Sequence, residues 1–269
     1  MTTALSDIKC FLLDLDGTFY VGERLIEGSV HFLEVLQEQG KDFLFLTNNS
    51  SKHRRLYAEK LNKFGVSVAA ARIFTSGEAT ALYLKDIRPE AHIYVVGTPA
   101  LEEEFQSHGF LLTEDNPDFA VLGFDTTLTY AKLRKLCDLV RAGVPYIATH
   151  PDLNCPTETG FMPDIGAMIA FVKASTGREP DQIIGKPSRL IIDVLSQKIH
   201  SPITTLAMVG DRLYTDIALG SSANITTILV LSGESRREDL KNSPFQPDYI
   251  FSNLGALAKR LSQDAHKSL

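Results

Sequence analysis

Short apolar segments alternate with amphipathic segments along most of the chain. The first two apolar segments, residues 9–16 (KCFLLDLD) and 41–51 (KDFLFLTNNSS), are hydrophobic on both faces, as buried strands of parallel sheets are. Helical spacing follows each of them, in residues 29–40 and 53–65, and each helical stretch ends in glycine. Strand–helix–strand order with short connections indicates a parallel sheet with right-handed crossovers. We therefore expect an α/β protein with a doubly wound, Rossmann-like core.

The later chain repeats this alternation. In the middle, strands are predicted at residues 91–97, 118–125 and 144–152, and helices at 100–109, 129–143 and 166–177. Near the C-terminus, strands are predicted at 204–211, 226–233 and 247–253, with a helix at 214–223. The middle stretch is about 100 residues long, which is enough for a small domain. We predict a discontinuous core of residues 1–79 and 180–269, with an α/β domain inserted at 80–179.

Composition and charge exclude several classes of protein. The 269 residues are 44% hydrophobic, which fits a globular protein with a sizeable core. The net charge of −6, with mixed signs along the chain, argues against a nucleic-acid partner, which needs a basic face. No apolar run approaches the ~18 residues of a membrane span, and the first ten residues do not read as a secretory leader. Three distant cysteines, Cys10, Cys137 and Cys155, favour reduced thiols in a cytoplasmic protein.

Polar residues at predicted strand ends indicate a ligand site. Asp14 and Asp16 end the first apolar segment, Thr47 and Asn48 end the second, and Asp211 ends a later one. Ligands of parallel α/β sheets bind beyond the carboxyl ends of the strands. A period of two puts Asp14 and Asp16 on the same side of an extended segment, and close carboxylates in a partly dry site need a compensating cation. Carboxylate oxygens from Asp14, Asp16 and Asp211 suit Mg²⁺.

Each piece also has a plain structural interpretation by itself. DLDGT (14–18) can be an acidic turn, and TNNSS (47–51) can be a polar loop with a helix cap. Lys186 can be a solvated lysine before a helix-starting proline, and Asp211 can be a turn residue. All four occur in this order, and each falls at a predicted strand end or helix start. That combination favours a functional site.

The ordered set resembles the haloacid dehalogenase (HAD) superfamily. The first motif of that family, DxDx[TV], matches DLDGT; the second is a strand ending in Thr or Ser; the third is a lysine, here within GKP; and the fourth is an acidic pair, here within GDRLYTDI. The matching residues are Asp14, Asp16, Thr18, Thr47, Lys186, Asp211 and Asp216. The sequences TNNSS, GKP and GDRLYTDI resemble the corresponding motifs of class IIA of that superfamily. This class includes NagD-like nucleotidases, 4-nitrophenylphosphatases, and pyridoxal and phosphoglycolate phosphatases. The resemblance covers essentially the whole chain and implies a HAD-like core with an inserted α/β cap of the C2 type.

The resemblance implies a Mg²⁺-dependent phosphatase that hydrolyses small phosphorylated metabolites through an aspartyl-phosphate. By this resemblance Asp14 is the nucleophile and Asp16 is the general acid/base. The metal ligands are then the Asp14 carboxylate, the Asp16 backbone carbonyl and Asp211. The second aspartate separates this chain from the true dehalogenases, because a halide leaving group needs no proton.

The same resemblance assigns the phosphate-binding groups. They are the Thr47 hydroxyl, the Asn48 backbone N–H and the Lys186 ammonium. Asp216 and Thr18 are expected one shell outside the metal, with Asp216 acting through a metal-bound water or by orienting Lys186.

Substrate choice is expected to depend on the cap loop at residues 148–168 (ATHPDLNCPTETGFMPDIGAM). Relatives tend to read ATNPD and PGAG there, whereas this chain has His150 and Asp164. These two and Asn49 are the candidate specificity residues. The plain alternative is that His150 is a hinge residue and Asp164 a helix cap. Sugar phosphates, nucleotides, phosphoglycolate and pyridoxal phosphate all stay open, with 4-nitrophenyl phosphate as the substrate in vitro.

Two other functions stay open at this point. Phosphotransferases share both aspartates, although the phosphoglucomutases belong to a different cap branch. A non-catalytic phosphometabolite-binding protein could use the same fold, but it would have no use for an attacking carboxylate. Some relatives pair through their caps, so the resemblance allows a homodimer without requiring one.

Overall fold

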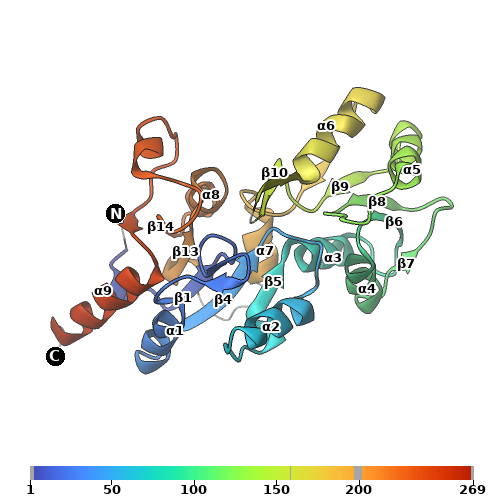
Figure 1. The fold of residues 1–269 in the computed structure, drawn as a ribbon. Coiled ribbons are helices and arrows are strands. Elements are labelled where there is room, and N and C mark those ends of the chain that lie inside the picture. The colour runs from blue at the N-terminus through green and yellow to red at the C-terminus, as the bar shows by residue number, and fades with distance from the viewer. Residues whose placement is uncertain (1–2, 158, 197–201, 268–269) are drawn as a thin grey trace. The chain divides into compact units, whose positions relative to one another are not determined.

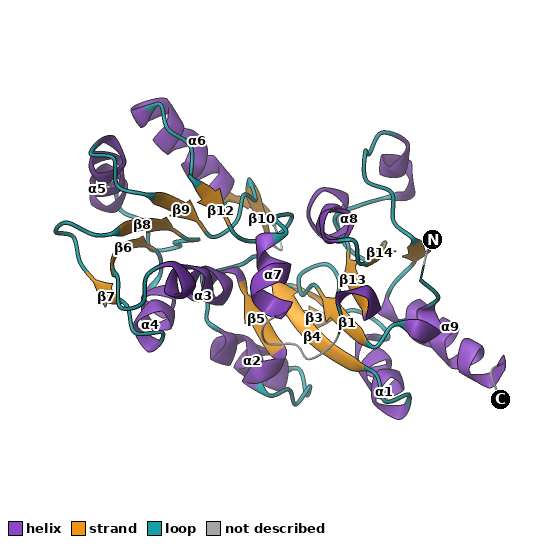
Figure 2. Cartoon of the chain, turned by 180° about the vertical axis from the view of Figure 1, so that it is seen from behind, coloured by secondary structure: helices purple, strands orange, loops and turns teal. Residues whose placement is uncertain are grey.

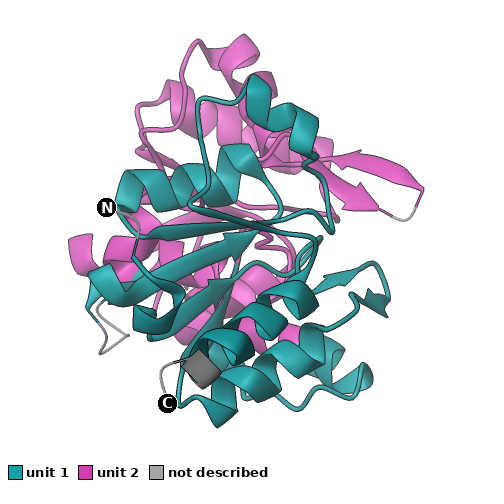
Figure 3. Ribbon diagram, turned by 90° about the vertical axis from the view of Figure 1, so that its left-hand side faces the viewer, with its two compact units in different colours: residues 1–46, 58–73, 195–269 teal, residues 47–57, 74–194 magenta. Residues whose placement is uncertain are grey.

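The computed structural model describes residues 3–157, 159–196 and 202–267, drawn in Figure 1. The chain forms two compact units, shown in Figure 3: unit 1 contains residues 1–46, 58–73 and 195–269, and unit 2 contains residues 47–57 and 74–194. The inserted segment predicted at 80–179 falls inside unit 2. Among the described residues, no helix has the length and apolar character that crossing a membrane requires.

A six-stranded sheet has the order β15-β14-β13-β1-β4-β5. Its strands are β1 (Cys10–Leu13), β4 (Asp42–Thr47), β5 (Ile73–Thr75), β13 (Leu206–Gly210), β14 (Thr226–Val230) and β15 (Tyr249–Phe251). The pairs β1–β13, β1–β4, β13–β14 and β14–β15 are parallel. Every residue of β1, β13 and β14 is buried, as expected for strands with two apolar faces. The predicted α/β class with a parallel core sheet is confirmed.

In the part of the chain that the structure describes, four α-helices and a small hairpin accompany this sheet. They are α1 (Ser29–Glu38), α2 (Arg54–Lys63), α8 (Ala218–Ala223), α9 (Leu254–Lys267) and the hairpin of β2 (Tyr20–Val21) and β3 (Arg24–Leu25). Helix α1 packs against α9. The glycines expected to end α1 and α2, Gly40 and Gly65, have φ angles of 63° and 80°, the left-handed conformation typical of that position. The helix predicted at 214–223 begins instead as a π-helical turn, Leu213–Ile217, and only then continues as α8.

A second, five-stranded sheet lies in unit 2 and has the order β12-β9-β8-β6-β7. Its strands are β6 (His92–Val96), β7 (Leu111–Leu112), β8 (Phe119–Leu122), β9 (Tyr146–Ala148) and β12 (Gln182–Ile183), all paired in parallel. The other elements are α3 (Ser76–Ile87), α4 (Pro99–Ser107), α5 (Tyr130–Arg141), α6 (Ile165–Thr176), α7 (Leu190–Ser196) and the antiparallel hairpin of β10 (Asn154–Thr157) and β11 (Gly160–Pro163). Figure 2 shows α5 and α6 on one face of this sheet and α3 and α4 on the other.

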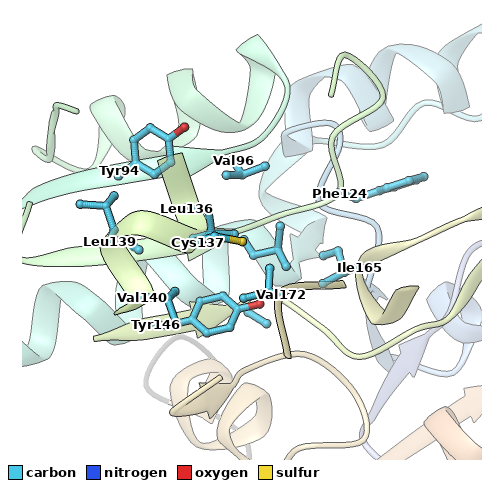
Figure 4. Close-up of a cluster of buried hydrophobic side chains, with 13 residues drawn as sticks. Tyr94, Val96, Phe124, Leu136, Cys137, Leu139, Val140, Tyr146, Ile165 and Val172 are labelled. Carbon is cyan, nitrogen blue, oxygen red and sulfur yellow. The ribbon is translucent and has the colours of Figure 1, made fainter. Parts of the chain in front are cut away.

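The hydrophobic core of unit 2 lies between this sheet and helices α5 and α6. Figure 4 shows the inward side chains of α5, such as Leu136 and Val140, beside Tyr94 of β6 and Tyr146 of β9. Val172 of α6 completes the same cluster. Unit 2 therefore has a core of its own, which is what an independently packed inserted domain requires.

Candidate active site

Three carboxylates gather at the carboxyl end of the six-stranded sheet in unit 1. Asp14 directly follows β1 and Asp211 directly follows the neighbouring strand β13, and the Asp14 N–H donates to the Val209 carbonyl at 2.9 Å. Oxygen atoms of Asp14, Asp211 and Asp216 all lie within 4.8 Å of one another. The exposed fractions of the three residues are only 9%, 2% and 0%. The two strand ends thus bring Asp14 and Asp211 together as the sequence predicted, whereas Asp216 joins them from a later turn and Asp16, which was predicted with them, is not in this group.

Glycines make the room that this acidic cluster occupies. A Cβ atom on Gly17 would lie 2.4 Å from Asp211 Oδ2, and one on Gly233 would lie 2.0 Å from the same oxygen. A Cβ on Gly210 would lie 2.1 Å from Asp216 Cγ. Gly17 also has a φ angle of 89°, which disfavours any residue with a side chain. Backbone thus approaches Asp211 from two loops, one of them inside the DLDGT motif.

Hydrogen bonds fix the orientation of the Asp211 carboxylate. The Glu234 N–H donates to Oδ2 at 2.7 Å, and the Thr18 hydroxyl donates to Oδ1 at 3.4 Å. Ser232 Oγ donates to the Gly17 carbonyl at 2.8 Å and so joins the two loops. Thr18 is fully buried, and its hydrogen bond to Asp211, a predicted metal ligand, is the kind of contact expected of a residue one shell outside the metal.

Asp216 comes from the π-helical turn at Leu213–Ile217. Its Oδ2 accepts the Arg212 N–H at 3.1 Å. Such turns occur often at functional sites, because the extra residue redirects a side chain. Here the turn brings the fourth-motif carboxylate into the cluster with Asp14 and Asp211, and its role one shell outside the metal stays a prediction.

The cluster is electrostatically unfavourable without a cation. Burial raises the pKa of Asp211 well above its ordinary value of 3.8, and the charges of Asp14 and Asp216 raise it further. The Glu234 N–H and the Arg212 guanidinium lower this pKa, but burial and the two carboxylates outweigh them. A divalent ion bound by the oxygens would remove this repulsion. The donor set, which consists of hard carboxylate oxygens, fits a metal ion of that kind.

Asp16 lies at the start of the β2–β3 hairpin in unit 1. The Tyr20 hydroxyl donates to Asp16 Oδ2 at 3.4 Å, and the Gly17 N–H donates to the Tyr20 carbonyl at 2.8 Å. The Lys60 ammonium lies 3.9 Å from the centre of the Tyr20 ring, a cation–π contact. Tyr20, the second residue after the first motif, therefore packs inside unit 1 and contacts the candidate acid/base Asp16.

The predicted phosphate-binding residues Thr47, Asn48 and Lys186 gather in unit 2. They are only 3%, 5% and 2% exposed. The Asn48 carboxamide accepts the Lys186 N–H at 2.8 Å and donates to the Lys186 carbonyl at 2.9 Å. Thr47 Oγ1 accepts the Asn49 N–H at 3.2 Å. Motifs two and three, which are distant in sequence, are thus bonded to each other.

The three candidate specificity residues have mainly local partners. Asn49 Oδ1 accepts both the N–H and the hydroxyl of Ser51, at 3.0 and 2.7 Å. Asp164 is the N-cap of α6 and accepts the Ile165 N–H at 2.7 Å. His150 is 0% exposed and Asp164 is 3% exposed. Their role in specificity stays a prediction.

Asp152 is a candidate functional residue that the sequence analysis did not single out. It is 8% exposed, and its Oδ1 accepts the Asn48 Nδ2–H at 3.0 Å. Together with His150 and Asp164 it forms a second buried group of potential metal ligands. The sequence signal was present, because Asp152 lies in the THPD stretch beside His150, but no local pattern shows that it reaches Asn48.

Two family models match the chain. One is described as haloacid dehalogenase-like hydrolase and matches residues 11–111, and the other is described as HAD-hydrolase-like and matches residues 183–257. An acid sugar phosphatase of Staphylococcus haemolyticus is 35% identical over 98% of this chain and 100% of its own length. A 5'-nucleotidase of Bacillus subtilis is 33% identical over 91% of this chain and 96% of its own length.

Solved structures agree with these relatives. A 4-nitrophenylphosphatase from Thermotoga maritima is 50% identical, with a TM-score of 0.93, and the match covers 95% of this chain and 98% of that one. NagD from Escherichia coli K-12 is 34% identical, with a TM-score of 0.86, over 92% and 97% of the two chains. The chain belongs to the haloacid dehalogenase-like hydrolases. Within that family it is a phosphatase, which confirms the resemblance drawn from its motifs.

The acidic cluster predicts how stability responds to Mg²⁺ and pH. Because the pKa of Asp211 is raised in the folded state, the stability that Asp211 contributes is full below its ordinary value and is lost as the pH rises through the folded-state value. A bound cation offsets that loss, so Mg²⁺ should raise the melting temperature more at pH 8 than at pH 5. At about 100 times the dissociation constant the gain is about 2.7 kcal/mol, or about 5–10 °C for a chain of this size.

Asp211→Asn is the control for this experiment. It removes one of the repelling charges, so the metal-free variant should melt above the metal-free wild type at pH 8. It should also lose most of the Mg²⁺-induced shift. A shift of equal size at both pH values, or one that survives in the variant, would mean that Mg²⁺ acts elsewhere.

Proposed function

We propose that the chain hydrolyses phosphate monoesters of small metabolites, with Mg²⁺ as its cofactor and an aspartyl-phosphate as its intermediate. The observation that carries this proposal is the buried group formed by Asp14 after β1, Asp211 after β13 and Asp216 in the π-helical turn. The names of the relatives, an acid sugar phosphatase, a 5'-nucleotidase and a 4-nitrophenylphosphatase, support phosphorylated small molecules as the substrate class.

The Asp14 carboxylate, the Asp16 backbone carbonyl and the Asp211 carboxylate would hold the ion. Bound there, Mg²⁺ supplies positive charge that lets an anionic nucleophile approach an anionic phosphoryl group. Asp211 would be kept ionised by the ion and fixed in place by the Glu234 N–H. The assignment of Mg²⁺ over other divalent ions is supported by the all-oxygen donor set and the small number of protein ligands.

The chain's own residues would perform the reaction in two steps. An Asp14 oxygen attacks phosphorus while the ester O–P bond breaks, and Asp16 gives its proton to the leaving oxygen. Asp16 then takes a proton from the water that attacks the phosphorus of the acyl phosphate, which releases inorganic phosphate and restores Asp14. Lys186, the Thr47 hydroxyl and the Asn48 backbone N–H would bind the phosphoryl oxygens during both steps.

Further parts of the proposal concern the cap and the cell. Residues 80–179 would act as a cap that encloses the leaving group. The family resemblance also allows a homodimer, and analytical ultracentrifugation would measure the oligomeric state. We propose a cytoplasmic location, supported by free thiols at Cys10, Cys137 and Cys155. Burial raises the pKa of the Cys10 thiol to about 11, so this group stays protonated and unreactive.

Asp14→Asn tests the nucleophile. The amide keeps the shape of the side chain but offers no anionic oxygen, so hydrolysis of 4-nitrophenyl phosphate should fall on the order of 10⁵–10⁶-fold, the loss typical of covalent hydrolases without their nucleophile. Release of 4-nitrophenol in freshly purified protein measures this loss, and circular dichroism checks that the fold is intact. Near-normal turnover in the variant would rule out the covalent mechanism.

Asp16→Asn tests the acid/base role through the leaving group. An alkyl phosphate needs a proton on its departing oxygen, whereas 4-nitrophenolate leaves with little help. The value of kcat/KM should therefore fall by ~10²–10⁴ for an alkyl phosphate and by clearly less for 4-nitrophenyl phosphate. If both substrates lose the same factor, Asp16 does not protonate the leaving group.

A panel of phosphorylated metabolites identifies the preferred substrate. Sugar phosphates, nucleoside monophosphates, phosphoglycolate and pyridoxal phosphate would be ranked by kcat/KM at a fixed Mg²⁺ concentration. The relatives' names predict sugar phosphates and nucleotides in the upper part of that ranking. If no member of the panel is turned over faster than 4-nitrophenyl phosphate, the substrate class proposed here is wrong.

A further inference from the structure

The side chain of Asn48 forms a two-way pair with the backbone of Lys186. Asn48 Oδ1 accepts the Lys186 N–H at 2.8 Å, and Asn48 Nδ2 donates to the Lys186 carbonyl at 2.9 Å. The carboxamide thus imitates one peptide unit of a neighbouring strand and satisfies both polar groups of the lysine backbone. Both residues are at least 95% buried, so leaving either group without a partner would be costly.

Asp152 fixes the orientation of this carboxamide. The second Nδ2 hydrogen of Asn48 points to Asp152 Oδ1, at 3.0 Å. An ionised carboxylate only accepts hydrogen bonds and a backbone N–H only donates. The amide nitrogen must therefore face Asp152 and the amide oxygen must face the Lys186 N–H, so the flipped orientation is excluded.

Two glycines allow this arrangement. A Cβ on Gly185 would lie 2.7 Å from Asn48 Oδ1 and 2.8 Å from His150 Cβ. A Cβ on Gly166 would lie 2.4 Å from the Pro151 carbonyl oxygen, and the Gly166 N–H donates to the Asp152 carbonyl at 2.7 Å. The glycine of the GKP motif is thus explained by the close approach of the Asn48 side chain.

His150 and Asp164 support Asp152 from the other side. His150 Nδ1 accepts the Asp152 N–H at 3.3 Å and lies 3.8 Å from Asp152 Oδ2. The other ring nitrogen, Nε2, lies 3.6 Å from Asp164 Oδ1 at the N-terminus of α6. Asp152 Oδ1 and Asp164 Oδ1 each accept an N–H bond, so both carboxylates are held in place by contacts inside unit 2.

We propose that Asn48 and Asp152 are positioning residues for Lys186, with His150 and Asp164 as their support. The inference rests on the proposed role of Lys186 at the phosphoryl group. Because every substrate shares that group, disturbing the network should change all substrates by one common factor. Residues that contact the leaving group would instead change the ranking of substrates.

The test combines a single and a double variant. Asn48→Asp places two carboxylates face to face and removes the donor to the Lys186 carbonyl. It should lower kcat/KM for every phosphate monoester by a common factor of about 10–100 and raise the inhibition constant of inorganic phosphate. Adding Asp152→Asn restores a donor–acceptor pair, with the donor now at position 152 and the acceptor at position 48. Relative to Asn48→Asp, the double variant should raise kcat/KM and lower the phosphate inhibition constant by at least about twofold each.

Glu104→Gln is the matched control, and Asp152→Ala is a second route. Glu104 is a carboxylate of unit 2 that is only 5% exposed and contacts an imidazole, His108, at 3.1 Å. Its replacement should lower the melting temperature but leave the phosphate inhibition constant unchanged. If Asn48→Asp does not fold, Asp152→Ala removes the acceptor of the Asn48 Nδ2 hydrogen bond. This variant should also lower kcat/KM by one common factor for all substrates, and the factor should be smaller than that of Asn48→Asp.

Lys186→Ala separates failure of the inference from failure of the proposed function. If this variant keeps wild-type activity and phosphate inhibition, the proposed role of Lys186 is wrong. If Lys186→Ala is strongly impaired while Asn48→Asp is not, only the positioning inference fails. The inference is also overturned if the double variant is no better than Asn48→Asp, or if the variants reorder the substrates. The expected result is one loss factor for all substrates, a weaker inhibition by phosphate, and partial recovery in the double variant.

Discussion

Repulsion among Asp14, Asp211 and Asp216 is the interaction on which the rest of the site depends. Three carboxylates with oxygens within 4.8 Å of one another, each at most 9% exposed, are a costly arrangement for a folded chain. A divalent cation bound as proposed would offset this cost. In the proposed mechanism the same cation would also let the anionic Asp14 approach phosphate, because it would neutralise the charge that repels phosphate.

The backbone brings these carboxylates together. Strands β1 and β13 are adjacent and parallel, so their carboxyl ends deliver Asp14 and Asp211 to the same edge of the sheet. Gly17 and Gly233 then let two loops close around Asp211, and the π-helical turn directs Asp216 toward it. The surrounding hydrophobic strands thus hold a preorganised, unfavourable charge arrangement, as catalytic sites commonly do.

The sequence predicted those parts of the fold and site that depend on local patterns. Two-sided apolar segments predicted β1 and β4, the returning strand–helix alternation predicted β13 and β14, and the strand ends placed Asp14 and Asp211 at one edge of the sheet. Local patterns did not reveal the π-helical turn, because its residues have ordinary helical spacing. Helix α3 and the β10–β11 hairpin were also missed, since α3 follows a strand of only three residues and the hairpin residues are mostly exposed rather than alternating in burial.

The contacts of Asn48 were beyond sequence analysis for a different reason. Its partners are separated from it by 104 residues at Asp152 and by 138 residues at Lys186, and no periodicity connects such positions. The loop that follows β4 is bonded into unit 2, for example by the contact of Ser50 with Thr149 at 2.9 Å. The sequence placed this loop with the core because it follows a core strand directly. This loop follows a strand of the six-stranded sheet in the chain, but its tertiary hydrogen bonds join it to unit 2.

The most direct test of the account is to trap the covalent intermediate. The protein would be mixed with Mg²⁺ and excess 4-nitrophenyl phosphate, quenched in acid within milliseconds, and digested for peptide mass spectrometry. The account predicts one acid-stable, hydroxylamine-sensitive phosphoryl group on the peptide that contains Asp14, and none in the absence of Mg²⁺. A phosphoryl group on any other residue, or turnover without a phosphorylated peptide when hydrolysis of the intermediate is slowed by Asp16→Asn, would contradict it.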